Sequence, residues 1–271
     1  MKYKLIQEEN VENLGNVGYV EAPFDEALQL LQENEYQAPI SGRDLAFARI
    51  KKGVDSSLSQ YGSYIREGML REPKEPQRVL FLSISSIIED AKKATQAHRA
   101  GSEYIPSDKI VEEYRNQAEE DMKKDPQDRR VFIAPKAESY TISTKSLDED
   151  ELALWLFKDQ VKKYKELLQE NNIEEMPVWL PGADYIKSQD KPFERQLWLH
   201  HLGDGSELSG YYGGFYCDFR LRGVSRGAVT AEGGSQKISE SYTLKDITEA
   251  LETLKLEGLE QLILDQLKQK D

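Results

Sequence analysis

The residues with the most evident chemistry are two adjacent histidines, His200 and His201. They precede a glycine-rich run that carries Asp204 and Glu207. Imidazoles and carboxylates bind metal ions and transfer protons near neutral pH. However, residues 196–202 (QLWLHHL) predict a β-strand, in which neighbouring side chains point to opposite faces. We therefore expect the two imidazoles to diverge and predict no metal site and no cofactor. A site with one histidine beside Asp204 or Glu207 stays open as the alternative.

The glycines that follow have the spacing of a phosphate-binding loop, with Gly205 and Gly210 five positions apart. Such a loop continues with a lysine, a hydroxyl residue and a helix, whereas two tyrosines follow here. The next residues alternate between apolar and polar types, which is typical of a half-buried strand. We therefore predict a hairpin in which this loop joins strand 196–202 to strand 211–223. A further strand at 228–232 would complete an antiparallel meander.

A locally basic segment is the main evidence for a ligand. Residues 41–99 contain eleven basic and seven acidic side chains, whereas the whole chain has 36 basic and 49 acidic residues and a formal net charge of -13. Cationic groups gathered by folding on an anionic protein would attract a small anion. We predict that a small anionic or phosphorylated ligand binds beside this segment, through Arg43, Tyr61, Tyr64, Arg66 and Arg99. In the alternative interpretation, these bases only balance neighbouring acidic helices.

The same segment ends in the best candidates for acid–base catalysis. His98 is the one histidine near the basic segment, and Glu103 follows it closely. An imidazole titrates near neutral pH, and a carboxylate can accept a proton. We therefore predict His98 and Glu103 as the catalytic residues if the chain is an enzyme. No nucleophile with a base and an orienting group can be recognised from the spacing, so the sequence leaves open whether it is one.

Composition limits the compartment and the partners. The net negative charge disfavours binding to nucleic acid, whose phosphates it repels. No apolar run approaches the roughly 20 residues that span a bilayer, and the charged start (MKYKLIQEENVEN) lacks the apolar core of a signal peptide. A single cysteine, Cys217, excludes an internal disulfide framework. We expect a soluble cytoplasmic protein that contacts no membrane.

Periodicity and end signals predict the elements that would position these residues. Apolar runs or alternation predict strands at 2–7, 17–22, 78–83, 129–135 and 176–181. Apolar periodicity predicts helices at 23–34, 41–53, 86–101, 107–126 and 146–169, the last from the capping-box pattern of Ser146 and Glu149. Together these elements predict an α+β fold, with a mixed sheet flanked by helices, a C-terminal antiparallel meander and a C-terminal helix.

The predicted elements change along the chain from alternating strands and helices to strands with glycine-rich loops, which suggests two regions. Residues 1–145 form an α/β-type region with the basic segment, and residues 146–271 form a helix, the meander and the C-terminal helix, although one continuous domain is an open alternative. The leucine-rich residues 244–271 suggest a second function. In that hypothesis the chain is a non-enzymatic module that binds another protein, or a second copy of itself, through this helix. Packing of the same helix on the core is the competing interpretation.

Overall fold

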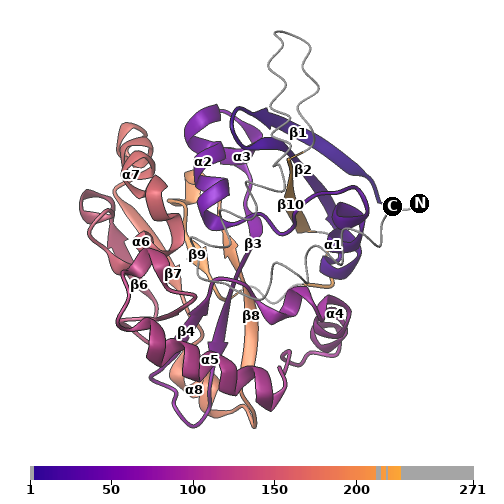
Figure 1. The fold of residues 1–271 in the computed structure, drawn as a ribbon, viewed down its shortest axis with the longest axis vertical. Coiled ribbons are helices and arrows are strands. Elements are labelled where there is room, and N and C mark those ends of the chain that lie inside the picture. Colours follow the sequence, from indigo (N-terminus) through magenta and orange to yellow (C-terminus); the bar gives the residue numbers. More distant parts are fainter. Residues whose placement is uncertain (1–2, 212–214, 218, 227–271) are drawn as a thin grey trace, which may run out of the picture. The chain divides into compact units, whose positions relative to one another are not determined.

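The structure is a computed structural model that describes residues 3–211, 215–217 and 219–226. The strands of these residues form one sheet (Figure 1) and are β1 (Leu5–Val11), β2 (Gly15–Ala22), β3 (Ser63–Arg71), β4 (Val79–Leu82), β5 (Val131–Ile133), β6 (Tyr140–Ser143), β7 (Glu175–Trp179), β8 (Phe193–Leu199), β9 (Leu208–Ser209) and β10 (Phe219–Ser225). The helices are α1 (Phe24–Glu33), α2 (Gly42–Lys52), α3 (Ser57–Gln60), α4 (Ala91–Arg99), α5 (Asp108–Asp121), α6 (Glu151–Phe157), α7 (Val161–Glu170) and α8 (Ala183–Lys187). Short 3-10 turns lie at Ser86–Ile88, Pro126–Asp128, Thr144–Ser146, Lys158–Gln160 and Leu202–Asp204.

Strand β3 lies at the centre of the sheet, whose order is β1-β2-β10-β3-β8-β9-β7-β6. It pairs in parallel with β10 at Tyr64 and antiparallel with β8 from Ser63 to Arg71. From Gly68 onward it also pairs with β4, which in turn pairs with β5. The β7–β9 pair is parallel as well. The sheet is therefore mixed, as the sequence predicts.

Separate hydrophobic cores lie on the two faces of this sheet. On β3, Tyr64 belongs to a core that includes side chains of α1 and α4, whereas its neighbour Ile65 belongs to a core with α2, α6 and α7. Adjacent residues of a strand point to opposite faces, so helices cover the sheet from both sides. A third core joins α5 to β4 and β5. The predicted α+β class is confirmed.

Local end signals set several helices where the sequence predicts them. The Ser41 hydroxyl accepts a hydrogen bond from the Asp44 amide (3.0 Å) at the start of α2. Gly53 ends the same helix with φ 79°, a backbone conformation that only glycine adopts without strain. Helices α1, α4 and α5 and strands β2, β4, β5 and β7 also lie at predicted positions.

The predicted helix 146–169 is wrong at its start and at its middle. Asp150, not Ser146, caps α6, because its Oδ1 accepts the hydrogen bond of the Ala153 amide (3.0 Å). The chain then leaves the helical conformation at Lys158, where φ is 51°, and α7 begins as a separate helix. A capping-box pattern identifies a possible cap, but a better-placed aspartate four residues later takes that role.

The central strand β3 lies in a region that the sequence shows as irregular. The run Arg66, Glu67, Gly68 interrupts the apolar alternation, so periodicity does not reveal the strand. Eight of its nine residues are nevertheless buried. Helices cover both faces of the sheet at this strand, which removes the alternation on which the prediction depends.

The predicted meander has a different pairing. Strand β8 pairs with β9 only at Trp198–Ser209 and Leu199–Leu208. Strand β10 crosses to β2 instead and pairs with it from Phe219–Ala22 to Ser225–Asn16. The long ladder with β2 supplies more backbone hydrogen bonds than a local hairpin across glycine-rich residues. The predicted strand 228–232 lies outside the described residues.

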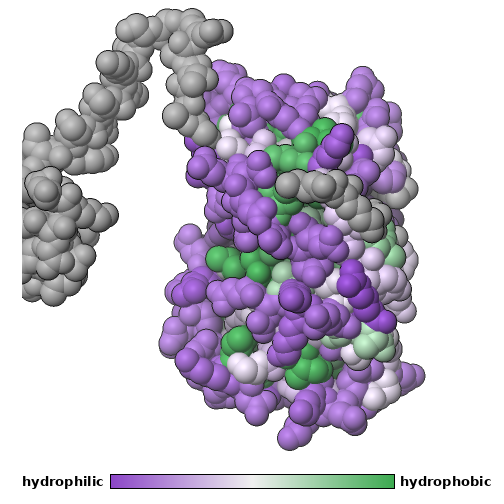
Figure 2. Space-filling model, turned by 90° about the vertical axis from the view of Figure 1, so that its right-hand side faces the viewer, coloured by the Kyte–Doolittle hydropathy of each residue, from purple (hydrophilic) through white to green (hydrophobic). Residues whose placement is uncertain are grey.

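Strands from both predicted regions pair within the one sheet, since β3 precedes residue 145 and β8 follows it. The boundary near residue 145 stays a prediction, and the C-terminal helix 244–271 lies outside the described residues. None of the helices described here is both long and apolar enough to cross a membrane. On the face shown in Figure 2, hydrophobic residues form small separate patches among hydrophilic ones.

Candidate functional site

The three arginines predicted to bind a ligand lie in three separate ion pairs. Arg43 is the most tightly held, because its Nε and Nη2 donate to both carboxylate oxygens of Asp159 (2.6 and 2.9 Å). The other two pairs are wider: Arg66 with Glu67 at 3.7 Å and Arg99 with Glu26 at 4.0 Å. Within the described residues, these arginines share no carboxylate. Their role in binding an anion stays a prediction.

The two predicted tyrosines occupy different environments. Tyr64 is 1% exposed and packs edge-on against Phe24 and Trp198, so it contributes to the core. Tyr61 is half-exposed, and the guanidinium of Arg220 lies 4.0 Å from its ring centroid. Arg220 lies equally close to the ring of Tyr19, in a cation–π stack. The exposed tyrosine is therefore already in contact with a cation of this chain.

The predicted acid–base residues lie within electrostatic reach of each other. His98 is buried against Phe215, with ring centroids 4.5 Å apart. Burial raises the pKa of Glu103, but hydrogen bonds from Arg195 and Tyr185, with the Arg195 and His98 charges, outweigh it and hold that pKa below its ordinary value. A carboxylate stabilised in its charged form is a weak proton acceptor. Catalysis by His98 and Glu103 stays a prediction.

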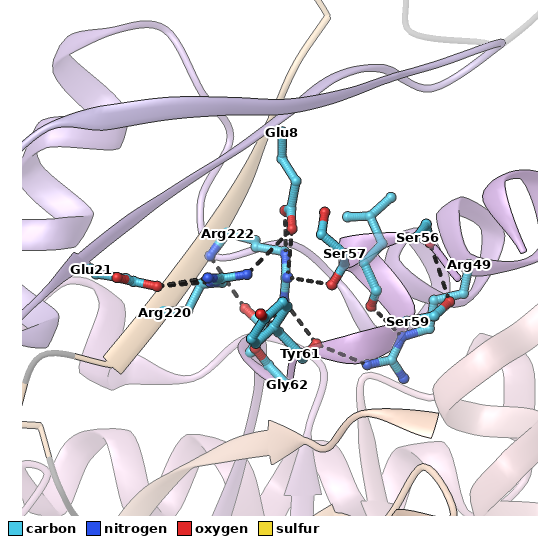
Figure 3. A network of polar contacts seen from close by, with 12 residues as sticks. Glu8, Glu21, Arg49, Ser56, Ser57, Ser59, Tyr61, Gly62, Arg220 and Arg222 are labelled. Atoms are coloured by element: carbon cyan, nitrogen blue, oxygen red, sulfur yellow. Dashed lines mark hydrogen bonds and ion pairs between the residues drawn. The ribbon is translucent and has the colours of Figure 1, made fainter. Parts of the chain in front are cut away.

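Two fully buried arginines outside the predicted set hold the loop around α3 (Figure 3). Arg222 on β10 donates to the Glu8 carboxylate (2.7 and 2.8 Å) and to the carbonyls of Ser57, Tyr61 and Gly62 (3.1, 3.1 and 2.8 Å). Burial raises the pKa of Glu8, but the hydrogen bonds from Arg222 and Ser57 and the charges of Arg222 and Arg220 together outweigh burial and hold that pKa below its ordinary value, so Glu8 stays ionised. The opposite charges of this buried ion pair therefore neutralise each other, and its guanidinium also bonds the loop backbone.

Arg49 on α2 satisfies a second set of carbonyls. It donates to the carbonyls of Leu58 (2.9 Å) and His200 (2.7 Å) and to the hydroxyl of Tyr164 (2.9 Å). A buried carbonyl without a partner costs about 1–3 kcal/mol. One guanidinium therefore ties the loop after α2 to the chain that follows β8.

Three large, exposed aromatic side chains lie at or after the ends of the paired strands β7 and β9, and we call Trp179, Tyr185 and Tyr211 the aromatic face. Arg195 contacts two of them. The Arg195 guanidinium lies 5.2 Å from the Tyr185 ring centroid and 6.0 Å from that of Tyr211. Its Nη1 donates to the carbonyls of Gly210 (3.2 Å) and Tyr211 (3.1 Å). The buried Glu103 carboxylate holds both Arg195 and the Tyr185 hydroxyl.

Glu207 holds the third aromatic side chain. Its Oε2 accepts the indole hydrogen bond of Trp179 (2.8 Å), and its Oε1 lies 3.0 Å from Nε2 of His200. The His200 and His201 ring centroids are 6.4 Å apart. Within the described ranges, no group of three or more His, Cys, Asp or Glu side chains is placed to hold a metal ion. The histidine beside Glu207 thus orients a side chain of the aromatic face.

Sequence reasoning missed both the aromatic face and Arg195. A tyrosine or tryptophan after a strand can be core or surface, and only the exposure values separate the buried Tyr64 from the exposed Tyr211. A weak signal was present. Tyr211 follows a glycine-rich loop, and exposed aromatic residues on loops are typical of binding surfaces.

Glu67 on β3 places a buried carboxyl beside the first residue of α2. Its Oε2 accepts a hydrogen bond from the Gly42 amide (3.0 Å). Burial raises its pKa to about 7, and the opposing effects of the Arg66 charge and the amide are smaller. A carboxyl with this pKa loses its proton near neutral pH at a cost to the folded state.

We expect Glu67→Gln to reduce the pH dependence of stability. Because the folded pKa lies above the unfolded value, wild-type stability falls as pH rises from about 4.5 to 7. The free energy of unfolding should therefore shift in favour of the variant by about 2–3 kcal/mol between pH 5 and 8, measured by urea denaturation. Glu194, whose pKa burial also raises to about 7, is present in both proteins and cancels in this difference. Parallel stability curves for the two proteins would show that Glu67 does not titrate in this range.

Comparisons with known proteins concern the fold. No protein-family model matches the chain, and no curated protein matches it. A solved structure described as "Accommodation of massive sequence variation in Nanoarchaeota by the C-type lectin fold" is similar to 79% of this chain and 99% of its own. The identity is 14% and the TM-score is 0.56. The described residues therefore have a C-type lectin-like α+β fold.

Proposed function

We propose that this chain is a binding module for another protein and that the aromatic face is its contact surface. The observation that carries the proposal is the exposure of Trp179, Tyr185 and Tyr211, at 46%, 42% and 63%. Tryptophan and tyrosine are enriched among the residues that dominate binding energy, because each buries a large area and loses little conformational entropy. Two of these side chains lie beside the Arg195 guanidinium, and the third, Trp179, is held by Glu207.

The support beneath this face favours binding. Arg195 holds the backbone of Gly210 and Tyr211, and Glu103 holds the hydroxyl of Tyr185. Glu207 fixes the indole of Trp179. Side chains and backbone that are held before contact lose less entropy when a partner binds.

The solved neighbour bears on the framework beneath this face. It is described as accommodating massive sequence variation with the C-type lectin fold, and that description concerns the neighbour alone. A fold that accommodates sequence variation needs a framework held by buried contacts. The guanidinium–carbonyl bonds of Arg49 and Arg222 are contacts of that kind.

Replacing the aromatic face tests the proposal. Wild type, the double variant Trp179→Ala/Tyr211→Ala and the control Met122→Ala are immobilised, and proteins retained from an extract of the source cells are quantified by mass spectrometry. Met122 is 59% exposed and directly follows α5, so the control also removes an exposed apolar side chain. We expect a defined protein to be retained by wild type and control and at least tenfold less by the double variant, a loss of about 1.4 kcal/mol or more. Equal retention by all three proteins would refute the proposal.

A small anionic ligand beside residues 41–99 is the second candidate function. Arg66 favours it, because its Nε is buried and has no hydrogen-bond partner within the described residues. We expect a nucleotide or phosphorylated metabolite at 100 times its Kd to stabilise the wild type by about 2.7 kcal/mol in a thermal-shift assay. Arg66→Met should lose this shift and Lys92→Met should keep it. Screening without any stabilising anion would reject this candidate.

We also infer a cytoplasmic location and a partner surface on the leucine-rich residues 244–271. The single cysteine, Cys217, supports a reducing compartment. Binding of another protein or a second copy through residues 244–271 stays a prediction, because those residues lie outside the described part of the chain.

A further inference from the structure

A cavity of about 540 Å³ lies apart from the aromatic face. It is bounded by the start of α5, the residues that follow β3 and the segment that leads into β8. Its volume lies within the range of about 300–1,000 Å³ that small-ligand sites occupy.

An ion pair forms part of the wall of this cavity. The Glu72 side chain is 3% exposed, and the Nε of Arg115 donates to both of its carboxylate oxygens (3.3 and 3.1 Å). Glu72 raises the pKa of Arg115, mainly through this hydrogen bonding, so the guanidinium stays charged. A guanidinium has five N–H donors and a carboxylate about four acceptor sites, so the pair retains capacity for further bonds of both kinds.

Charges of both signs also line the cavity. Lys74 and Lys109 contribute cations, and Asp108, Glu112 and Asp190 contribute anions. Lys109 and Glu112 are ion-paired with Glu113 and Arg115. Within the described residues, the exposed side chains of Lys74, Asp108 and Asp190 have no ion-pair partner. Val111 on α5 and Pro192, just before β8, add apolar groups to the lining. The lining therefore carries cationic, anionic and apolar groups.

We propose that this cavity binds a short peptide with free termini, such as a tripeptide. The peptide carboxylate lies toward Lys74 and its ammonium toward Asp108 and Asp190. Its backbone amides bond the Glu72–Arg115 pair, which supplies acceptors and donors, and a small apolar side chain packs on Val111. A singly charged metabolite would leave lining charges of one sign unpaired. A ligand with both charges and amide groups can pair lining charges of both signs and bond the Glu72–Arg115 pair.

The test compares free with blocked termini. Wild-type protein is incubated with a mixed tripeptide library, either with free termini or N-acetylated and C-amidated, and bound peptides are separated by gel filtration and quantified by mass spectrometry. We expect the free library to be retained at least tenfold more than the blocked library. Failure to retain either library, or equal retention of both, would overturn the proposal.

Matched variants locate the site. Lys74→Glu should lower retention of free peptides by about tenfold or more, whereas Lys92→Glu, the same charge reversal at an exposed position on α4, should leave it unchanged. Equal losses in the two variants would place the peptides elsewhere. Trp179→Ala/Tyr211→Ala should retain the peptides, so the outcome is independent of the proposed protein-binding face.

Discussion

Buried guanidinium groups that donate to backbone carbonyls hold the loops of this fold. Arg49, Arg71 and Arg222 have no exposed surface, and each bonds the carbonyls of segments far away in the sequence. Loops that cross a protein interior expose carbonyls that no sheet or helix satisfies, and leaving them unpaired is costly. One arginine carries five donors in a planar fork, so it can satisfy several such carbonyls at once.

The need to satisfy buried carbonyls explains why several arginines of the chain lie in its interior. Folding does bring positive side chains together, since Arg49 and Arg222 both bond the carbonyl of Tyr61. They serve the framework, while the more exposed Arg43 and Arg99 lie beside carboxylates on the surface. A guanidinium bonded to carbonyls also lies beneath the aromatic face, where Arg195 donates to the carbonyls of Gly210 and Tyr211 and to the carboxylate of Glu103.

Local chemistry made part of the fold predictable. Ser41 and Gly53 end α2 through contacts within a few residues, and the apolar run of β4 is visible in the sequence. The pairing of β10 with β2 joins residues about two hundred positions apart, and no local pattern encodes it. The site was less predictable for the same reason. Arg43 and Arg49 are both arginines on α2. Only tertiary packing places Arg43 in a surface ion pair and makes Arg49 a buried donor to a loop carbonyl.

Native-state hydrogen exchange in Arg49→Met and Arg43→Met tests the role of the buried guanidinium most directly. Both arginines lie on α2, but only Arg49 bonds loop carbonyls. If the account is correct, Arg49→Met speeds amide exchange in residues 56–62 and 200–206 by about tenfold or more, a local loss of about 1.4 kcal/mol, and Arg43→Met leaves it unchanged. Exchange in these segments that is unaffected by Arg49→Met, or affected equally by both substitutions, would contradict it.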